Sequence, residues 1–514
     1  MVRYLHFRIV GIALLLTLCV DPVTVFGQKK TRLIDYTSDI LKGDKLNDQV
    51  KKLMGHVVFH DSTATMYCDS AYFYENQDFD AYGNIRIYPD QSGTELVGDV
   101  LIYKAEDRTA DLTGKKVVLT DENAKLTTQS IFYNLNTGIS YYTTPGTIVT
   151  DDNVITSDLG SYDKHIRTFF FKQNVVVTNP DYIINTDTMN YNTASKIVDF
   201  LGPTLITSDK DSIYCEKGWY NTDTDISTFR QNAWLKYDDK VVQGDTLYYE
   251  KHTGFGKGFG NVQIWDTTQN VIVKGNYATI DRPDEKAVVT NKALMIQVDN
   301  KDSLYLHADT IRTGIFIEEA DTFKFMKAYY HVKFYRHDLQ GLCDSMYYSF
   351  KDSTLKFIGE PVLWANDTQL TSEFMQVFTK NQKMDRLEMQ NSSFIISYED
   401  SAKYDQIKGR NTTCYFADNE IYRMNVKGNG QSIYFLKDKG ITTAIQKAEC
   451  SDIIIYLKDR KLSKVTYINS VNGTLYPPPE LTGADLFLKD FVWHEYNRPK
   501  KWQDVFVWKK NTGL

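Results

Sequence analysis

Apolar and polar residues alternate along most of this chain with the two-residue period of β-strands. In Gly83-Asn-Ile-Arg-Ile87, for example, Ile85 and Ile87 share one face of a strand while Arg86 lies on the other. Clusters of turn-forming residues, such as Asn192-Thr-Ala-Ser195, separate the alternating runs. The pattern predicts an all-β protein of antiparallel strands with one apolar and one mixed face.

The alternating runs belong to a unit that repeats about every 29 residues. Each unit begins with an acidic or amide residue, followed by an apolar residue two positions on and usually Tyr four positions on. The clearest starts are Asp69, Asp99, Gln129, Asp158, Asp187, Glu216 and Asp245. A second half-unit runs in step, so each unit holds two strands of about ten residues. Such units bury their apolar face by stacking, which predicts an elongated antiparallel β-roll, or β-jellyroll.

The shared apolar face is the candidate lumen of this roll. A Gly, Asn or Pro ahead of each second strand predicts a bend or bulge that lets a long strand curl around it. The lumen is either a packed core, the usual role of an apolar face, or a channel for an apolar ligand. The candidate lumen residues, which would bind lipid in a channel, are Ile85, Ile87, Leu101, Val117, Leu119, Ile131, Ile148, Val175, Val177, Met189, Leu205, Leu247, Val262 and Ile264.

No pattern in the chain indicates a catalytic residue, a metal site or a cofactor. Calcium-binding β-rolls place an Asp in every nine-residue, glycine-rich rung. Asp69 and its equivalents are too far apart for this, so we expect them to cap turns at strand starts. His56 and His60 have no third ligand for zinc. The motif Gly254-Phe-Gly-Lys-Gly-Phe-Gly260 lacks the strand–loop–helix context of a phosphate loop, and predicts a flexible hairpin instead.

The N-terminus has the pattern of a secretory signal peptide over residues 1–27. A basic start precedes the apolar run from Ile9 to Val20, which is too short to span a membrane, and Val25-Phe-Gly27 predicts cleavage before Gln28. Cys19 follows Leu18, where a lipid-attachment box has a small residue, so we expect no lipid anchor. The chain is therefore expected to be exported.

After the signal, the pattern divides the chain into four parts. Residues 28–51 form an N-terminal lead-in and first strand, 52–270 the regular repeats, 271–476 divergent repeats, and 477–514 a tail rich in Pro and aromatic residues. This composition predicts a capping or docking segment, with a short helix expected over Leu481–Phe491. Net charge is −7 and no basic stripe is present, so a nucleic-acid surface is excluded.

Five cysteines remain in the exported chain. Cys68, Cys215 and Cys343 occupy the same phase of distant repeats, and a disulfide needs Cα atoms within about 7 Å, so we expect buried thiols. For Cys414 and Cys450 the sequence allows either a disulfide between neighbouring repeats or two free thiols.

The stretches Leu53-Met-Gly-His-Val-Val-Phe59, Met66-Tyr-Cys-Asp-Ser-Ala-Tyr-Phe-Tyr74 and Ala81-Tyr-Gly-Asn-Ile-Arg-Ile87 resemble the OstA-like family of organic-solvent-tolerance and lipopolysaccharide-transport proteins, in its long Bacteroidota form. The resemblance covers about residues 30–270 and weakens beyond. It implies a periplasmic β-jellyroll that shields lipopolysaccharide acyl chains on their way to the outer membrane. It also implies end-to-end pairing with other jellyroll proteins of the transport bridge or assembly machinery, or with a second copy.

Two other functions compete with lipid transport. One is a structural or adhesive β-solenoid of the cell surface that carries no lipid. The other is a carbohydrate-active β-helix enzyme, which needs paired carboxylates within about 10 Å. The two-strand unit argues against the enzyme, because parallel β-helices use shorter rungs.

Overall fold

The computed structural model describes residues 33–44, 47–62, 64–89, 93–121, 124–150, 152–299, 302–318, 321–380, 383–400, 403–418, 420–438, 440–458, 461–478, 480 and 482–509. The expected signal peptide, its cleavage site before Gln28 and Cys19 lie outside these residues. Within the described ranges, no helix has the length and apolar character needed to cross a membrane.

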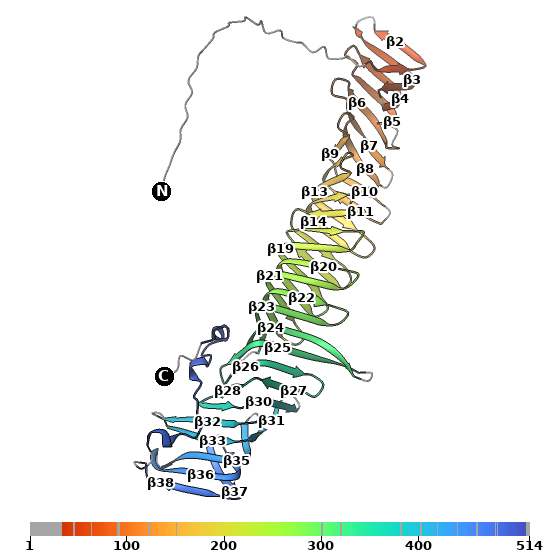
Figure 1. Cartoon of the computed structure of the whole chain (residues 1–514). Coiled ribbons are helices and arrows are strands. Elements are labelled where there is room, and N and C mark those ends of the chain that lie inside the picture. The colour runs from red at the N-terminus through yellow and green to blue at the C-terminus, as the bar shows by residue number, and fades with distance from the viewer. Residues whose placement is uncertain are drawn as a thin grey trace, which may run out of the picture.

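The described chain forms one antiparallel sheet of 38 strands, folded along its length into an elongated roll (Figure 1). The strands of the N-terminal half are β1 (Asp35–Thr37), β2 (Ile40–Asp44), β3 (Asn47–Asp61), β4 (Ala64–Tyr74), β5 (Phe79–Tyr88), β6 (Glu95–Lys104), β7 (Thr109–Asp121), β8 (Ala124–Asn134), β9 (Ile139–Tyr142), β10 (Gly146–Val149), β11 (Val154–Ser157), β12 (Leu159–Asp163), β13 (Thr168–Thr178), β14 (Ile183–Asn192), β15 (Ile197–Phe200), β16 (Thr204–Thr207), β17 (Asp211–Cys215), β18 (Lys217–Asn221), β19 (Ile226–Tyr237) and β20 (Lys240–Glu250).

The strands of the C-terminal half are β21 (Phe255–Asp266), β22 (Val271–Asp281), β23 (Lys286–Gln297), β24 (Leu304–Glu318), β25 (Asp321–Arg336), β26 (Leu339–Ser349), β27 (Thr354–Ile358), β28 (Val362–Ala365), β29 (Thr368–Thr371), β30 (Phe374–Lys380), β31 (Lys383–Gln390), β32 (Ser393–Asp400), β33 (Lys403–Gly409), β34 (Asn411–Ala417), β35 (Glu420–Asp438), β36 (Ile441–Lys458), β37 (Lys461–Ile468) and β38 (Asn472–Tyr476). The all-β, elongated antiparallel fold expected from the alternation is thereby confirmed.

Most long strands bend near their middle at a β-bulge. The pairing of β3 with β4 shifts register between Met54 and Val57, and that of β5 with β6 between Tyr82 and Ile85. The bulge residues have left-handed backbone, as at Gly83 with φ 80°. Because a bulge bends its strand, each long strand contributes one half to each of two walls, and the lumen lies between the walls.

The repeated acidic residues lie at these bends. Asp69, in the middle of β4, accepts a hydrogen bond of 2.8 Å from Asn84 Nδ2 at the bulge of β5. Asp245 in β20 accepts one of 3.0 Å from Asn261 in the same way. The prediction that this column caps turns at strand starts is therefore wrong. A spacing of 29 residues is the same for a turn and for a bend, and the strand begins several residues before the acidic position.

The core is made of three clusters of buried side chains. The first extends from Ile34 to Leu247 and the second from Val262 to Ile455, so the core divides near β20 and β21. In the first cluster aromatic rings fill the space between the walls, with Phe59 and Phe79 stacked at 3.8 Å between ring centroids. The third cluster, which includes Leu488 of the tail, lies on the other side of the sheet.

All five described cysteines are buried and free. The expectation for Cys68, Cys215 and Cys343 is confirmed, and Cys414 and Cys450 do not form a disulfide. Burial raises the pKa of the Cys68, Cys215, Cys343 and Cys414 thiols to about 12. Their thiolate population is therefore very small and they act as small apolar residues.

The C-terminal tail runs back along the outside of the sheet. Buried glutamines of the sheet bond its backbone: Gln406 Nε2 donates to Leu486 O, and Gln369 Nε2 to Val492 O, both at 2.8 Å. The expected helix over Leu481–Phe491 is reduced to one short turn, η1 (Gly483–Leu486), followed by η2 (Glu495–Asn497) and η3 (Trp502–Phe506). The sheet, not the tail itself, satisfies these backbone groups, so a regular helix is not needed.

The bends make a stability prediction at Gly83. A Cβ built on Gly83 would lie 2.4 Å from Asp69 Oδ2, and the residue has φ +80°, whereas Gly93, with φ +83°, has open space around it. Gly93→Ala should therefore cost only the left-handed backbone penalty, about 1 kcal/mol. Gly83→Ala should cost about 2–3 kcal/mol, because the Asp69–Asn84 bond is lost as well. Urea unfolding, with hydrogen exchange of β4 and β5, measures both losses, and equal losses would contradict the role of the bend.

Candidate functional site

Thirteen of the fourteen candidate lumen residues lie on the inner face. Ile264 is partly buried against the core, and the other twelve are buried: Ile85, Ile87, Leu101, Val117, Leu119, Ile131, Ile148, Val175, Val177, Met189, Leu247 and Val262. Two-residue alternation located them correctly on each side of the bulges. Their part in lipid binding stays a prediction.

Leu205 is the exception, because it faces outward and is 36% exposed. Its neighbours Thr204 and Ile206 take the inner positions of β16: Thr204 is fully buried and Ile206 packs against the core. The Thr204 hydroxyl can lie inside because it pairs with that of Thr186 at 2.8 Å. The placement of Leu205 in the lumen is therefore wrong. Apolarity alone selected Leu205, while the inner position is held by a satisfied Thr.

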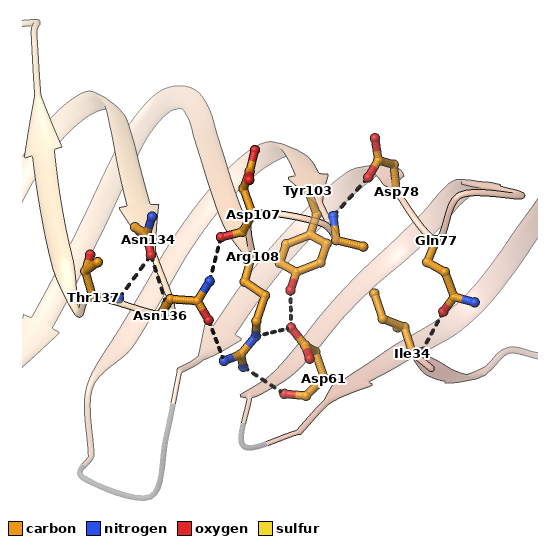
Figure 2. A network of polar contacts seen from close by, with 11 residues as sticks. Ile34, Asp61, Gln77, Asp78, Tyr103, Asp107, Arg108, Asn134, Asn136 and Thr137 are labelled. Atoms are coloured by element: carbon orange, nitrogen blue, oxygen red, sulfur yellow. Dashed lines mark hydrogen bonds and ion pairs between the residues drawn. The ribbon is translucent and has the colours of Figure 1, made fainter. Parts of the chain in front are cut away.

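Near the N-terminal end of the roll, a polar clasp joins the two walls (Figure 2). Asp61, at the end of β3, is 3% exposed at its side chain and pairs with Arg108 Nε, 2.8 Å away, whose side chain is 10% exposed. Tyr103 also donates to the Asp61 carboxylate, and Arg108 reaches Asn136 Oδ1 at 3.3 Å. Burial and this bond to Asp61 raise the pKa of Tyr103. The clasp therefore stays paired and holds the two hairpin rims together.

Weaker clasps join the rims further along the roll. Tyr162 Oη lies 3.5 Å from Asp121 Oδ2. Beyond it, Arg282 Nη1 lies 3.5 Å from Asp211 Oδ2 and 3.2 Å from the Tyr249 hydroxyl, and its guanidinium stacks on the Tyr237 ring at 4.4 Å. The side chains of Arg282 and Asp211 are about one-third exposed, so the attraction between their charges is screened by water.

An apolar cavity opens beneath Arg282. Its apolar lining includes Ile213, Phe229, Leu235, Val242, Leu247, Ala278 and Ile280, with Tyr237, Tyr249 and Arg282 among the residues around it. Gly256 and Gly258 of β21 also line it, where the first core cluster has aromatic and branched residues. Gly256 has no side chain to fill the space beside it, whereas Val262 already packs against Gly258, so the cavity lies beside Gly256, where the first and second core clusters divide.

The motif Gly254-Phe-Gly-Lys-Gly-Phe-Gly260 marks this cavity in the sequence, although its pattern on its own predicts a flexible hairpin. Only Gly254 lies in a hairpin turn, while Gly256 and Gly258 lie inside strand β21, so the hairpin prediction is wrong for most of the motif. A second, neighbouring cavity is lined by Val177, Met189 and the rings of Tyr182, Tyr191 and Tyr220 among others. The candidate functional site is thus the middle of the lumen, where tyrosines and Arg282 line the two cavities.

Comparison with known proteins finds a family model that matches the N-terminal part of the chain. A family model described as OstA-like protein matches residues 30–187 and 183–240. The matched residues, 30–240, are similar to the OstA-like family. The family resemblance seen in the sequence is thereby confirmed over these residues, and the cavity under Arg282 straddles the end of the match.

One similar solved structure is LptH, the LptA-homologous periplasmic component of the lipopolysaccharide transport device of Pseudomonas aeruginosa. The two chains are 10% identical, and the match covers 27% of this chain and 95% of that one, with a TM-score of 0.22. No curated protein matches this chain by sequence.

The buried clasp should dominate the stability of the N-terminal rungs. Arg108→Leu leaves the Asp61 carboxylate buried without its cation, and should cost about 3–5 kcal/mol. Tyr162→Phe, at the partly exposed Asp121 contact, should cost less than about 1 kcal/mol. Urea unfolding with hydrogen exchange of β3 and β7 measures both changes.

The double variant Asp61→Asn/Arg108→Leu is the control for this prediction. It should recover part of the loss, because it removes the uncompensated charge. A double variant as unstable as Arg108→Leu would show that Arg108 acts by packing and not by pairing.

Proposed function

We propose that this protein is a periplasmic lipopolysaccharide-transport protein that shields acyl chains in its lumen. The match of residues 30–240 to the OstA-like family model supports this function, since the resemblance implies lipopolysaccharide transport. The observation that carries the proposal is the cavity at β17–β22, where Gly256 leaves an apolar space beside Arg282 and several tyrosines. A lumen needed only as a core would gain stability from filling that space.

The arrangement suits an amphiphile. Burying apolar chain surface contributes about 25 cal/mol per Å², and Phe229, Leu247 and Ile280 offer such a surface. At the rim, the Arg282 guanidinium and tyrosine hydroxyls can bond an anionic, hydroxyl-bearing headgroup. The walls meet here through side chains alone, so they can separate by bending at the bulges as a chain enters.

Both ends of the roll support pairing with other jellyroll proteins. At the N-terminal edge β1 and β2 pair with β3, and at the C-terminal edge β37 and β38 pair with β36. In the described part of the chain, the outer edges of these four strands have no strand partner. Unpaired edges can accept a strand of another chain, and Ile40, Leu41 and Leu475 expose apolar side chains there.

A structural role without lipid is the competing function. The observation in its favour is the packed N-terminal interior, where Phe59, Phe79 and Tyr103 stack ring on ring. A roll packed in this way throughout would serve as a scaffold or surface adhesin. The crosslinking experiment below separates the two functions.

Photo-crosslinking residues at Leu247 and Leu205 provide a matched test of the lumen. The first side chain lines the cavity and the second faces outward, although both replace leucine within the regular repeats. The inner position should capture lipopolysaccharide in cells and the outer one should not. Equal capture, or none at either position, would favour the structural role.

Filling the cavity supplies a variant that does not threaten the fold. A Cβ built on Gly256 meets its nearest atoms at 3.5 and 3.8 Å, an ordinary contact, so a side chain can start at this position without a clash. Gly256→Leu should keep or raise the urea midpoint and reduce lipid capture at Leu247 several-fold. By contrast, Leu247→Asp should stop capture at a cost of a few kcal/mol, because its carboxylate is buried without a partner. Unchanged capture in Gly256→Leu would exclude this cavity as the site.

The edges give a separate prediction about assembly. Lysines in an edge strand oppose pairing with another chain. Ile40→Lys/Leu41→Lys, or Leu475→Lys, should therefore reduce crosslinking to partner proteins or to a second copy at that end. Val149→Lys/Val154→Lys, at exposed positions in mid-roll, is the control and should leave pairing intact. Loss of pairing in the control alone would contradict the edge assignment.

A further inference from the structure

The end of the C-terminal tail forms a closed loop on the outer face of the roll. This C-terminal loop, Asn497–Lys509, contains η3, and its two ends bond each other: Asn497 Nδ2 donates to Lys509 O at 3.2 Å, and Lys509 N donates to Asn497 Oδ1 at 3.0 Å. Figure 1 shows it in dark blue beside β24 and β25. The loop is therefore a preformed unit that does not belong to the lumen.

Specific contacts hold this loop on the sheet. Val505 is fully buried beneath it, and the buried Lys333 of β25 donates to Val507 O at 2.6 Å. The Lys333 ammonium also lies 4.6 Å from the centre of the Trp508 ring, and Trp502 stacks on Tyr305 of β24 at 5.3 Å. The loop is thus fixed from below, so its outward surface has a defined shape.

The outward surface is apolar and aromatic. Trp502, Phe506, Val507 and Trp508 are each between 37% and 47% exposed, although each ring also contacts the sheet or the loop. Four large apolar side chains exposed within seven residues form a patch of the kind that marks an interaction site.

Lysines surround this patch. Lys500, Lys501 and Lys509 are exposed, and the Lys500 ammonium pairs with Glu495, just before the loop. The one acidic residue of the loop, Asp504, turns its carboxylate back to accept bonds from the backbone N–H groups of Lys500 and Lys501, at 2.9 and 3.2 Å. The surface of the loop is therefore basic on a chain whose net charge is −7. This charge is complementary to an anionic partner.

We propose that the C-terminal loop docks on an anionic lipid surface. Tryptophan has an apolar body and a polar N–H, which suits the boundary between headgroups and acyl chains, and lysine extends its ammonium from an apolar stem toward phosphates. Trp502, Phe506, Val507 and Trp508 enter this boundary, while Lys501 and Lys509 contact the lipid phosphates. The loop would hold the flank of the roll against a membrane, independently of what the lumen carries.

Vesicle flotation of the purified mature chain tests this docking. The chain should float with vesicles of phosphatidylcholine containing about 30 mol% phosphatidylglycerol, and much less with pure phosphatidylcholine. Lys501→Glu/Lys509→Glu should weaken binding roughly tenfold or more, because four units of charge change at the surface. Lys116→Glu/Lys236→Glu makes the same charge change at exposed positions far along the chain, and should leave binding unchanged.

Brominated lipids locate the contact. They should quench the tryptophan emission of the vesicle-bound chain, and Trp502→Phe/Trp508→Phe should bind while losing most of that quenching. Three outcomes would overturn the proposal: no flotation with anionic vesicles, equal weakening in both charge-reversed variants, or binding without quenching. Binding of an acidic protein by the loop in place of vesicles would identify a different partner and also refute it. Gly256→Leu, which fills the lumen, should float normally, so the two proposals fail separately.

Discussion

The left-handed bend in the middle of each strand is the constraint on which the rest of this structure depends. An antiparallel sheet of this length would otherwise present two open faces to water. Bulges such as Gly83-Asn84 turn the second half of each strand back over the first, and an acidic residue of the preceding strand, here Asp69, bonds the bulge. Repetition of this bend folds one sheet into two walls with an interior between them, and leaves the rims to be joined by side chains.

The same backbone gives a packed or a hollow interior, according to the residues at the inner positions. Near the N-terminus these positions hold Phe59, Phe79 and Tyr103, whose rings stack and exclude any space. At β21 the inner position of Gly256 has no side chain while the strand keeps its pairing with β20, so a cavity results. The interior is therefore neither a uniform channel nor a uniform core, and its capacity for a ligand is encoded locally.

Local periodicity predicted the walls, because inner and outer positions alternate and the alternation is strong at residues such as Ile85 and Leu101. It failed at Leu205, where the inner neighbour is a hydrogen-bonded threonine, and at the acidic column, whose spacing does not distinguish a bend from a turn. The docking site of the tail depends on contacts across eighty residues or more, as between Gln406 and Leu486. One signal was present: runs such as Phe394-Ile395-Ile396 are apolar on both faces, which indicates a strand covered on both sides.

The clasps also determine where the two walls separate most easily. Asp61 and Arg108 are 3% and 10% exposed, so parting them strands two buried charges at a cost of several kcal/mol. Asp211 and Arg282 are 32% and 29% exposed and 3.5 Å apart, so water replaces most of their attraction and parting them costs little. The weakest clasp thus lies over the hollow part of the lumen, while the strongest lies over the packed part. Separating the rims therefore costs less at β17–β22 than at the N-terminal rungs, and at β17–β22 the separated rims lie beside a cavity.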